Sequence, residues 1–297
     1  MAPLEPAFKR IYRQPESSVN DKAAIYAIIA NNFHGSSWLL AAALLQGILT
    51  WTFPTVITFL PALVILAYRT LDMLLIMSGV LPNRYMQGIL PGKTSAQIPD
   101  ETGRFGETMS SEKVVVIILA SRSNHPLGIL YPGYQKIVKY FNAMHEDLEK
   151  NRKKYGYLSS TAWISLSDPS RTAAREIMHI FYFKSIGGLN EFAHGAAHRA
   201  GWDWWNHTVK EHPDLSMMHE LYEVPAGNWE NIYLNYWPAS FGSSVFPIRR
   251  TPEISKTGEL EVEESFEKGT EGTEWIGGLI DASKASLLTS EQRMGRS

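Results

Sequence analysis

The feature that most constrains the fold is a long run without any charged side chain, from Gly35 to Tyr68. One helical membrane span needs about 20 residues, so this run is longer than one span and marginal for two. Pro54 interrupts it, because proline lacks a backbone donor and stops a helix. The sequence therefore predicts two apolar helices, at about 37–52 and 55–77, that form a hairpin.

The flanks of this hairpin indicate a membrane location. Cations lie on both sides of the run, as expected when both ends face the cytosol. The run begins too far from Met1 for a cleaved secretory signal. We expect a hairpin that spans or dips into the endoplasmic reticulum or another internal membrane, with the remaining chain cytosolic. The alternative is a buried helical hairpin within a larger soluble domain. Aromatic side chains fall where interfacial residues are expected, at Trp38, Trp51, Tyr68 and Tyr85.

Charge and missing motifs exclude several classes of function. A formal net charge of -2 offers no basic face for nucleic acid, so nucleic acid is not an expected partner. The absence of cysteine rules out disulfides, thiolate nucleophiles and iron–sulfur ligands. The sequence shows no glycine-rich dinucleotide fingerprint, phosphate-binding loop or nucleophile elbow. An NAD-dependent or nucleotide-hydrolysing enzyme is therefore disfavoured.

Composition divides the chain into five segments. Gly, Pro, Thr and Ser are frequent at 88–111, which indicates a linker. Acidic and Gly/Ser-rich sequence after Pro247 indicates a largely disordered tail. The predicted segments are a polar N-terminal arm at 1–34, the membrane hairpin at 35–87, the linker at 88–111, one catalytic domain at 112–246 and the tail at 247–297.

The catalytic domain is predicted to be a ferredoxin-like α+β fold. The β-branched run at 113–120 is typical of a buried strand, and Pro132 suits the first turn of a helix. The order β-α-β-β-α-β gives a four-stranded antiparallel sheet with both helices on one face. The other face then pairs with a second copy in a homodimer or closes over a ligand cavity. The expected strands are 113–120, 158–166, 175–183 and 215–224, the helices 132–154 and 185–210, with a short fifth strand within 228–236.

Imidazole and indole groups gather in the second predicted helix. His194, His198 and Trp202 are spaced i, i+4 and i+8, so they are expected to share one helix face. One interpretation is a pocket wall in which a histidine moves protons and a tryptophan packs against a flat conjugated substrate. The other is a surface helix. The histidine pair also has metal-ligand spacing, with His219 or Glu220 as a third ligand, and haem bound through one histidine is a further alternative.

The strand predicted at 215–224 places its side chains alternately on two faces of the sheet. Only one set can line the open face, and periodicity does not decide which. His179, on the third strand, is subject to the same ambiguity. The two sets are Met217, His219 and Leu221 on one face, and Met218, Glu220 and Tyr222 on the other.

From Met218 to Gly242 the sequence reads MHELYEVPAGNWENIYLNYWPASFG. This resembles the stretch His-Glu-Thr-Tyr-x-Val-x-Ala-Gly-x-Tyr-Glu-x-Ile-Tyr-x-Asn of fungal and bacterial proteins typified by the fumagillin polyketide monooxygenase. The resemblance extends over about 112–242. It departs at Trp229, where the family usually has tyrosine, and in the loop from Tyr236 to Phe241. The matching residues are His219, Glu220, Tyr222, Val224, Ala226, Gly227, Glu230, Ile232, Tyr233 and Asn235.

The resemblance implies a relation to the antibiotic-biosynthesis monooxygenases of the dimeric α/β barrel superfamily. These enzymes oxidise conjugated polyketides with molecular oxygen, often without metal or flavin. We therefore expect a membrane-associated monooxygenase that acts on a hydrophobic polyketide or terpenoid intermediate of fungal secondary-metabolite biosynthesis. Its cofactor requirement is expected to be none, with oxygen as co-substrate. The alternatives are a cyclase, isomerase or dehydratase on the same scaffold, or a non-catalytic membrane-bound binding module.

On this interpretation, the candidate site residues take the following roles. Proton transfer is assigned to His198 and His219, and a hydrogen bond to a developing oxyanion to Asn235. A dry pocket is needed, because a carbanion-like substrate must meet oxygen before water protonates it. The expected substrate-binding residues are Trp202, Tyr222, Tyr233, His179 and Glu220.

Overall fold

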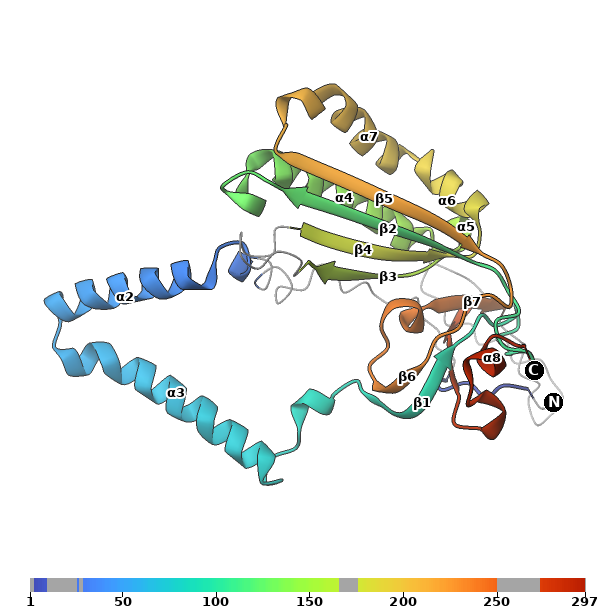
Figure 1. Ribbon diagram of the computed structural model, residues 1–297, viewed down its shortest axis with the longest axis horizontal. Coiled ribbons are helices and arrows are strands. Elements are labelled where there is room, and N and C mark those ends of the chain that lie inside the picture. Colours follow the sequence, from blue (N-terminus) through green and yellow to red (C-terminus); the bar gives the residue numbers. More distant parts are fainter. Residues whose placement is uncertain (1–2, 10–25, 27–28, 166–175, 250–272, 297) are drawn as a thin grey trace, which may run out of the picture.

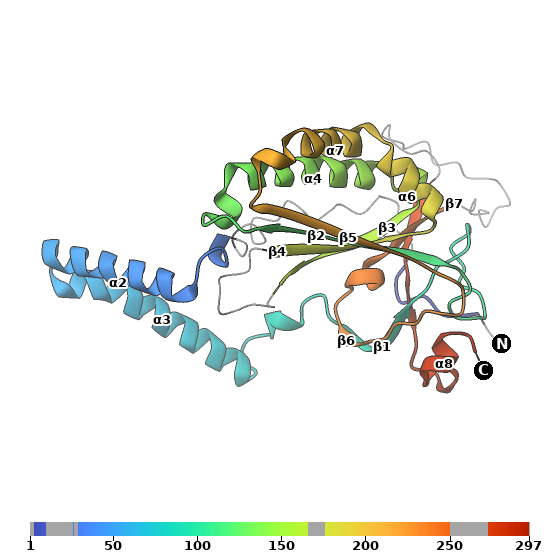
Figure 2. The ribbon, with the colours of Figure 1, turned by 45° about the horizontal axis from the view of Figure 1, so that its top comes forward.

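The computed structural model describes residues 3–9, 26, 29–165, 176–249 and 273–296, and the architecture below refers to these residues. Three antiparallel sheets and an N-terminal helical hairpin account for most of its regular structure. The hairpin projects away from the sheets in two views (Figures 1 and 2). The sheets form the part of the molecule in which a site can be built.

The apolar run forms the two helices that its sequence predicts, α2 (Gly35–Thr52) and α3 (Thr55–Met77). Pro54 separates them and is the N-cap of α3. Neither helix buries a single residue, and α3 is long and apolar enough to cross a membrane. The helices are thus confirmed, and their insertion into a membrane stays a prediction.

The order of elements predicted for the catalytic domain is confirmed. Its sheet has the strand order β3-β4-β2-β5, and every pair is antiparallel. The helices α4, α6 and α7 lie over one face of this sheet (Figure 2). The bounds are β2 (Val114–Ser123), α4 (Pro132–Lys150), α5 (Arg152–Tyr155), β3 (Tyr157–Ile164), β4 (Glu176–Phe183), α6 (Ile186–Ala193), α7 (Ala196–Thr208) and β5 (Leu215–Val224).

The second predicted helix is in fact two helices. The backbone leaves the helix at His194 and Gly195, between α6 and α7. A side chain at position 195 would meet the carbonyl oxygen of Phe192 at 2.9 Å, so the bend is packed tightly. The expectation that His194, His198 and Trp202 form one continuous helical stripe is therefore wrong, because His194 ends one helix and the other two lie on the next.

A second layer of strands packs against the open face of the ferredoxin-like sheet. The expectation of a linker at 88–111 is wrong where it contains β1 (Leu90–Ala96), because β1 pairs with β6 (Tyr233–Tyr236) and β9 (Leu279–Asp281). Proline and glycine are uncommon inside strands, so Pro91 and Gly92 make this segment resemble a loop in the sequence. Both residues lie at the register shift between Leu90 and Lys93. The described arm residues join this layer through a bridge between Pro6 and Ile280.

The expectation of a disordered tail at 247–297 is wrong over 273–296. β8 (Thr273–Gly277) pairs with β7 (Val245–Arg249), and α8 (Ser290–Arg293) follows β9. Burial of apolar side chains explains why this segment has regular structure. The side chains at most 3% exposed are Trp275, Ile276, Leu279 and Ile280. The part of the expected tail at 250–272 lies outside the described residues. Short helices complete the described structure at η2 (Arg84–Met86), η3 (Gly128–Leu130), η4 (Val209–Glu211), η5 (Ser240–Ser243) and η6 (Ala285–Leu287).

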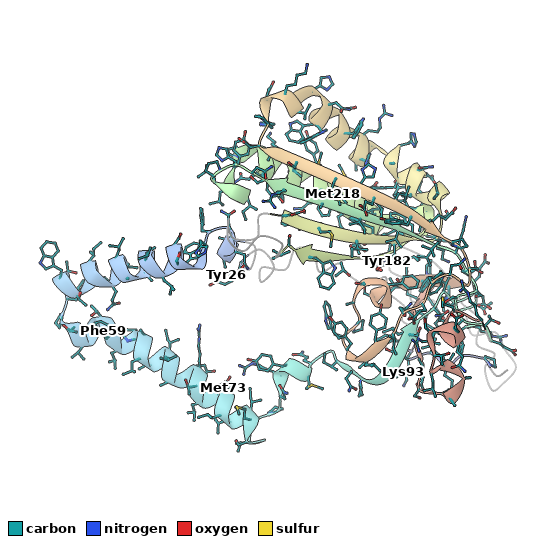
Figure 3. The ribbon with its side chains drawn as sticks, in the orientation of Figure 1. Tyr26, Phe59, Met73, Lys93, Tyr182 and Met218 are labelled. Atoms are coloured by element: carbon teal, nitrogen blue, oxygen red, sulfur yellow. The ribbon has the colours of Figure 1, made fainter. Side chains whose placement is uncertain are left out.

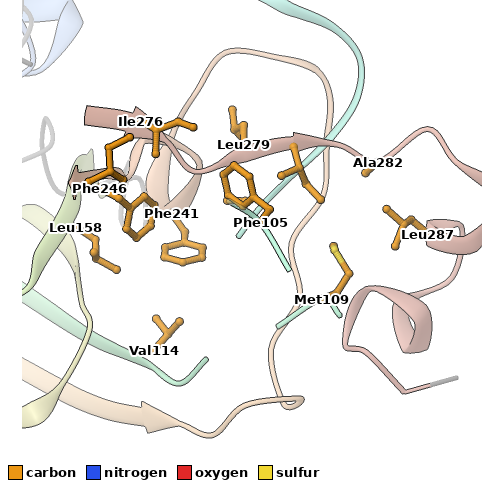
Figure 4. Packing of buried hydrophobic residues seen from close by; sticks show 13 residues of the cluster. Phe105, Met109, Val114, Leu158, Phe241, Phe246, Ile276, Leu279, Ala282 and Leu287 are labelled. Carbon is orange, nitrogen blue, oxygen red and sulfur yellow. The ribbon is translucent and has the colours of Figure 1, made fainter. Parts of the chain in front are cut away.

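Buried hydrophobic clusters lie on both sides of the sheet. On the helix side, Val115 and Phe181 pack with Leu148 and Phe192. On the other side, the second layer buries its side chains against Val114 and Leu158, as Figure 4 shows. The open face predicted for this fold is thus partly covered by the chain itself, and any cavity there lies between the sheet and the second layer.

The helix-side core contains one buried imidazole, His145, and borders a second, His179, which is half-buried. His145 on α4 is 3% exposed, and its Nε2 lies 3.0 Å from the hydroxyl of Ser160. Burial lowers the pKa of both His145 and His179 to about 4. Glu149 is 3.8 Å from His145, but Arg152 pairs with that carboxylate at 2.6 Å and its own charge further lowers the pKa of His145. Both imidazoles are therefore neutral at pH 7.

We expect the free energy of unfolding to fall as the pH is lowered from about 6.5 to about 4. The folded-state pKa values are below the ordinary value of 6.5, so the unfolded chain binds more protons in this window. The stabilisation is complete above pH 6.5 and is lost as the pH falls through the folded pKa values. Urea unfolding at pH 7, 5.5 and 4.5 measures the effect. A His179→Phe variant should show a shallower dependence, and an unchanged slope would contradict the assignment to this residue.

Candidate active site

A pocket of about 220 Å³ lies between the open face of the ferredoxin-like sheet and the second layer. Figure 3 shows Tyr182 on the first of these layers and Lys93 on the second. Val114, Val116, Val224 and Phe241 form the apolar wall. An apolar lining with a few polar groups is characteristic of small-molecule sites, and this cavity is smaller than their usual volume of about 300–1,000 Å³. The polar and aromatic lining consists of Tyr182, Trp229, Glu230, Asn231 and Tyr233.

Tyr233 places a phenol in this pocket. Its hydroxyl oxygen accepts a hydrogen bond of 2.8 Å from the backbone N–H of Gly242, so its own proton is not used in that bond. Burial raises its pKa to about 12, and the phenol is therefore protonated at neutral pH. Gly242 must lack a side chain, because a Cβ there would meet the Tyr233 ring at 2.8 Å. Tyr233 is thus a fixed hydrogen-bond donor.

Three further aromatic rings shape the wall. Tyr182 on β4 packs 5.3 Å from Phe241 in η5, and Trp229 meets Phe241 edge-on at the same distance. Burial raises the pKa of Tyr182, whose hydroxyl bonds with the Ser240 side chain and the Phe241 backbone. The Trp229 indole donates to the carbonyl of Glu112 at 2.7 Å, which fixes the ring. The wall is therefore rigid and suits a flat apolar molecule.

Glu230 is the carboxylate in the lining. Its Oε2 accepts a 2.7 Å bond from Nε of Arg293 in α8, and its Oε1 accepts from Ser290 at 3.3 Å. Arg293 is nearly buried and also donates to the carbonyls of Leu287 and Leu288, at 3.2 and 2.8 Å. The C-terminal segment thus orients the carboxylate.

Asn231 anchors the second layer beside Glu230. Its Oδ1 accepts from the Ala96 N–H at 2.6 Å, and its Nδ2 donates to the Ala96 carbonyl at 3.1 Å. Both ends of the amide are therefore used by β1. Asn231 positions the wall rather than offering a free group to a substrate.

Strand register decides which predicted residues face this pocket. Leu119 of β2, which packs into the helix-side core, lies opposite both His179 and His219. Side chains directly opposite in a sheet point to the same face. The two histidines are therefore on the helix side, and Glu220 and Tyr222 are on the open face with the pocket.

The other predicted histidine and tryptophan also lie away from the pocket. His198 and Trp202 are on α7, over the helix side, and Trp202 is 52% exposed. Burial lowers the pKa of His198, and His219 is among the nearby charges that lower it further. The expectation that these groups share one cavity with Tyr233 is wrong, because the sheet separates them.

The other predicted site residues, Glu220, Tyr222 and Asn235, lie on the same side of the sheet as the pocket but do not line it. Tyr222 donates a 2.6 Å hydrogen bond to Glu220, and both side chains are exposed next to the pocket rather than lining it. Asn235 has a φ of 47°, and its Oδ1 accepts from the Gly92 N–H at 2.8 Å. This bond links β6 to the paired strand β1 at the register shift between Leu90 and Lys93. Tyr233 is the predicted residue that lines the pocket.

Within the described ranges, no three His, Asp or Glu side chains gather as metal ligands. The proposed histidine pair is divided by the bend between α6 and α7, and His194 Nδ1 lies 2.7 Å from the carbonyl of Asn190. The sequence had marked no pocket role for Tyr182, Trp229, Glu230 or Phe241. Glu230 was nevertheless among the matched family positions, and Tyr182 alternates with the helix-side Phe181 and Phe183.

Residues 114–241 match the family described as Monooxygenase af470-like. This family is the one that the segment from Met218 to Gly242 indicated, and the resemblance is confirmed. Monooxygenase af470 of Aspergillus fumigatus is 28% identical over 297 residues, which is 100% of this chain and 98% of the relative. The chain is a monooxygenase-like enzyme.

Solved structures show more distant likeness. Aldoxime dehydratase OxdRE in complex with butyraldoxime matches 51% of this chain and 39% of its own length, at 14% identity and a TM-score of 0.39. A putative antibiotic biosynthesis monooxygenase from Deinococcus radiodurans covers 37% of this chain at 12% identity, with 91% of its own length matched and a TM-score of 0.25. SnoaB of Streptomyces nogalater, a cofactor-independent oxygenase, has the same coverage at 6% identity and a TM-score of 0.24.

Proposed function

We propose that this chain is a membrane-associated monooxygenase that oxidises a conjugated, hydrophobic polyketide or terpenoid intermediate in fungal secondary metabolism. The observation that carries the proposal is the position of the pocket. All nine lining residues lie within 114–241, the segment that matches the monooxygenase family. The site is apolar, aromatic and equipped with one carboxylate and two protonated phenols.

The reaction proposed is the conversion of an activated methylene group to a carbonyl. Removal of a proton gives a carbanion stabilised by conjugation, which adds O₂ to form a C–O bond and, after protonation, a hydroperoxide. Loss of water breaks the O–O bond and leaves C=O. One oxygen atom enters the product and the other leaves as water, and the substrate supplies all four electrons. No cofactor is required for this balance, and we propose that none is used.

The pocket residues are assigned roles in this sequence. Glu230 is placed to accept the proton, with Arg293 fixing the orientation of its carboxylate. Tyr233 donates its free proton to the oxyanion that develops on the substrate, and Tyr182 supports the same charge. The sheet separates His198 and His219 from this pocket, so proton transfer is assigned to Glu230 in their place. The apolar walls offer water few hydrogen-bonding partners, which limits quenching of the carbanion once the substrate fills the pocket.

Tethering to an internal membrane is part of the proposal. The exposed apolar surface of α2 and α3 is far larger than a soluble surface normally presents, and lipid would cover it. We place the hairpin in the endoplasmic reticulum or another internal membrane and the catalytic domain in the cytosol. A homodimer through the remaining open face, which exposes Met218 and Tyr222, stays a prediction.

Isotope incorporation tests the reaction class. Microsomes that contain the full chain are incubated with lipid extracts of a polyketide-producing host under ¹⁸O₂ or under nitrogen, and matched microsomes without the chain are the control. A product that carries one ¹⁸O atom, and that forms only with oxygen, is expected. A chain-dependent product that forms equally under nitrogen would instead establish a cyclase, isomerase or dehydratase.

A further inference from the structure

An exposed apolar rim borders the pocket. We define it as Leu234, Tyr236 and Trp237, which are 61%, 43% and 50% exposed. We propose that this rim rests in the surface of a lipid bilayer and that the hydrophobic substrate passes from the lipid into the pocket across it. This inference rests on the membrane tether of the proposed function and adds the route of substrate entry.

The rim is joined to the pocket by a series of aromatic rings. Tyr233 lines the pocket, its ring lies 6.4 Å from that of Tyr236, and Tyr236 lies 6.3 Å from Trp237. The series therefore leads from a buried phenol to a half-exposed indole. A conjugated molecule that moves along it remains in contact with apolar surface throughout.

The rim also lies beside the chain that leaves the hairpin. Tyr236 is opposite Leu90 in the β6–β1 pair, and Leu90 follows α3 after only a short connection. That connection exposes Tyr85 and Met86, at 73% and 54%. Exposed apolar side chains thus lie on α3, on η2 and on the rim, and the charged residue of η2, Arg84, is paired with Asp72 of α3.

Chemistry favours lipid over a second copy or a soluble partner as the occupant. The sequence from Asn231 to Ile248 contains no charged side chain. The neighbouring cation, Lys93 opposite Leu234, donates to the Leu287 carbonyl at 2.8 Å, so the rim residues themselves offer a protein partner no charge to pair with. Tryptophan and tyrosine are the residues that concentrate at the boundary between lipid and water. Continuity with the apolar hairpin places the rim at that boundary.

The absence of cysteine makes a direct test possible, because any introduced cysteine is the single labelling site. Three full-length variants, Trp237→Cys, Leu63→Cys and Lys150→Cys, carry an environment-sensitive nitrobenzoxadiazole probe in phosphatidylcholine vesicles. Leu63 reports the hairpin, and Lys150 lies on an exposed helix face. Nitroxide-labelled lipid should quench the probe at position 237 at least about twofold more than the probe at position 150.

The outcomes separate the two proposals. Quenching at position 63 with none at position 237 would overturn the rim and leave the tether intact. No quenching at position 63 would remove the tether, and the rim proposal with it. A concentration-dependent emission shift at position 237 in detergent, without lipid quenching in vesicles, would identify a second copy as the occupant and overturn the lipid assignment.

Discussion

Tyr233→Phe is expected to lower the rate of product formation about 100-fold, because it removes a donor aimed at the developing oxyanion. The structure supplies the reason for so large an effect. The Tyr233 hydroxyl is held by the Gly242 N–H, it is protonated at neutral pH, and its proton is free to turn toward a substrate. The measurement is the turnover rate at saturating substrate, once the isotope experiment has identified the product.

The matched control is Tyr140→Phe on α4, on the other side of the sheet. Tyr140 stacks on Trp204 and does not line the pocket, so the turnover number of this variant should remain within about twofold of the natural chain. Tyr233→Phe also leaves the Gly242 N–H without its partner, at a cost of about 1–3 kcal/mol in the free energy of unfolding. Both variants are therefore assayed at a temperature at which both are folded. Equal rates for the two would remove Tyr233 from the mechanism.

Arg293→Ala is expected to lower the free energy of unfolding by about 3 kcal/mol, the low end of the range for breaking a buried ion pair. Arg293 is 8% exposed, whereas Glu230 keeps 25% of its side chain accessible, and this access limits the penalty. The variant also leaves the carbonyls of Leu287 and Leu288 without their donor. Urea unfolding of the full chain in detergent, followed by circular dichroism, measures the change.

The control pair is Lys113 with Glu223, at 2.7 Å but with side chains 51% and 37% exposed. Lys113→Ala should cost less than about 1 kcal/mol, because water screens the charges. Adding Glu230→Gln to Arg293→Ala should recover part of the lost stability, since the uncompensated carboxylate is then removed. A double variant no more stable than Arg293→Ala would contradict the ion-pair explanation.

The ferredoxin-like half of the fold was predictable because its periodicity is strong. The β-branched run of β2 and the proline at the first turn of α4 give clear local signals. The strands of the second layer have no such local sequence signals. β1 contains Pro91 and Gly92 and is stabilised by pairing with distant strands, so its local sequence is typical of a loop. In the predicted tail, Trp275 and Ile276 are hydrophobic and could have indicated a strand. The acidic sequence before them favoured a prediction of disorder instead.

The site was predictable only in part, for a geometric reason. Alternation along β5 separates His219 from Glu220, but only pairing with β2 shows which of them faces the helices. Sequence similarity marked Glu230 and Tyr233 without giving their surroundings. Tyr182 and Arg293 belong to elements that are distant in the sequence from Glu230 and Tyr233. No local sequence pattern predicts that Tyr182 lines the pocket or that Arg293 binds Glu230.

The pairing of β1 with β9 has a consequence for biosynthesis. Thr94 lies opposite Asp281, so the wall behind Asn231 needs a strand that is translated long after the hairpin. The hairpin of the proposed tether is therefore synthesised before the pocket wall can be completed. A premature stop after β7 would leave the hairpin in place but remove β9, and the wall would stay incomplete.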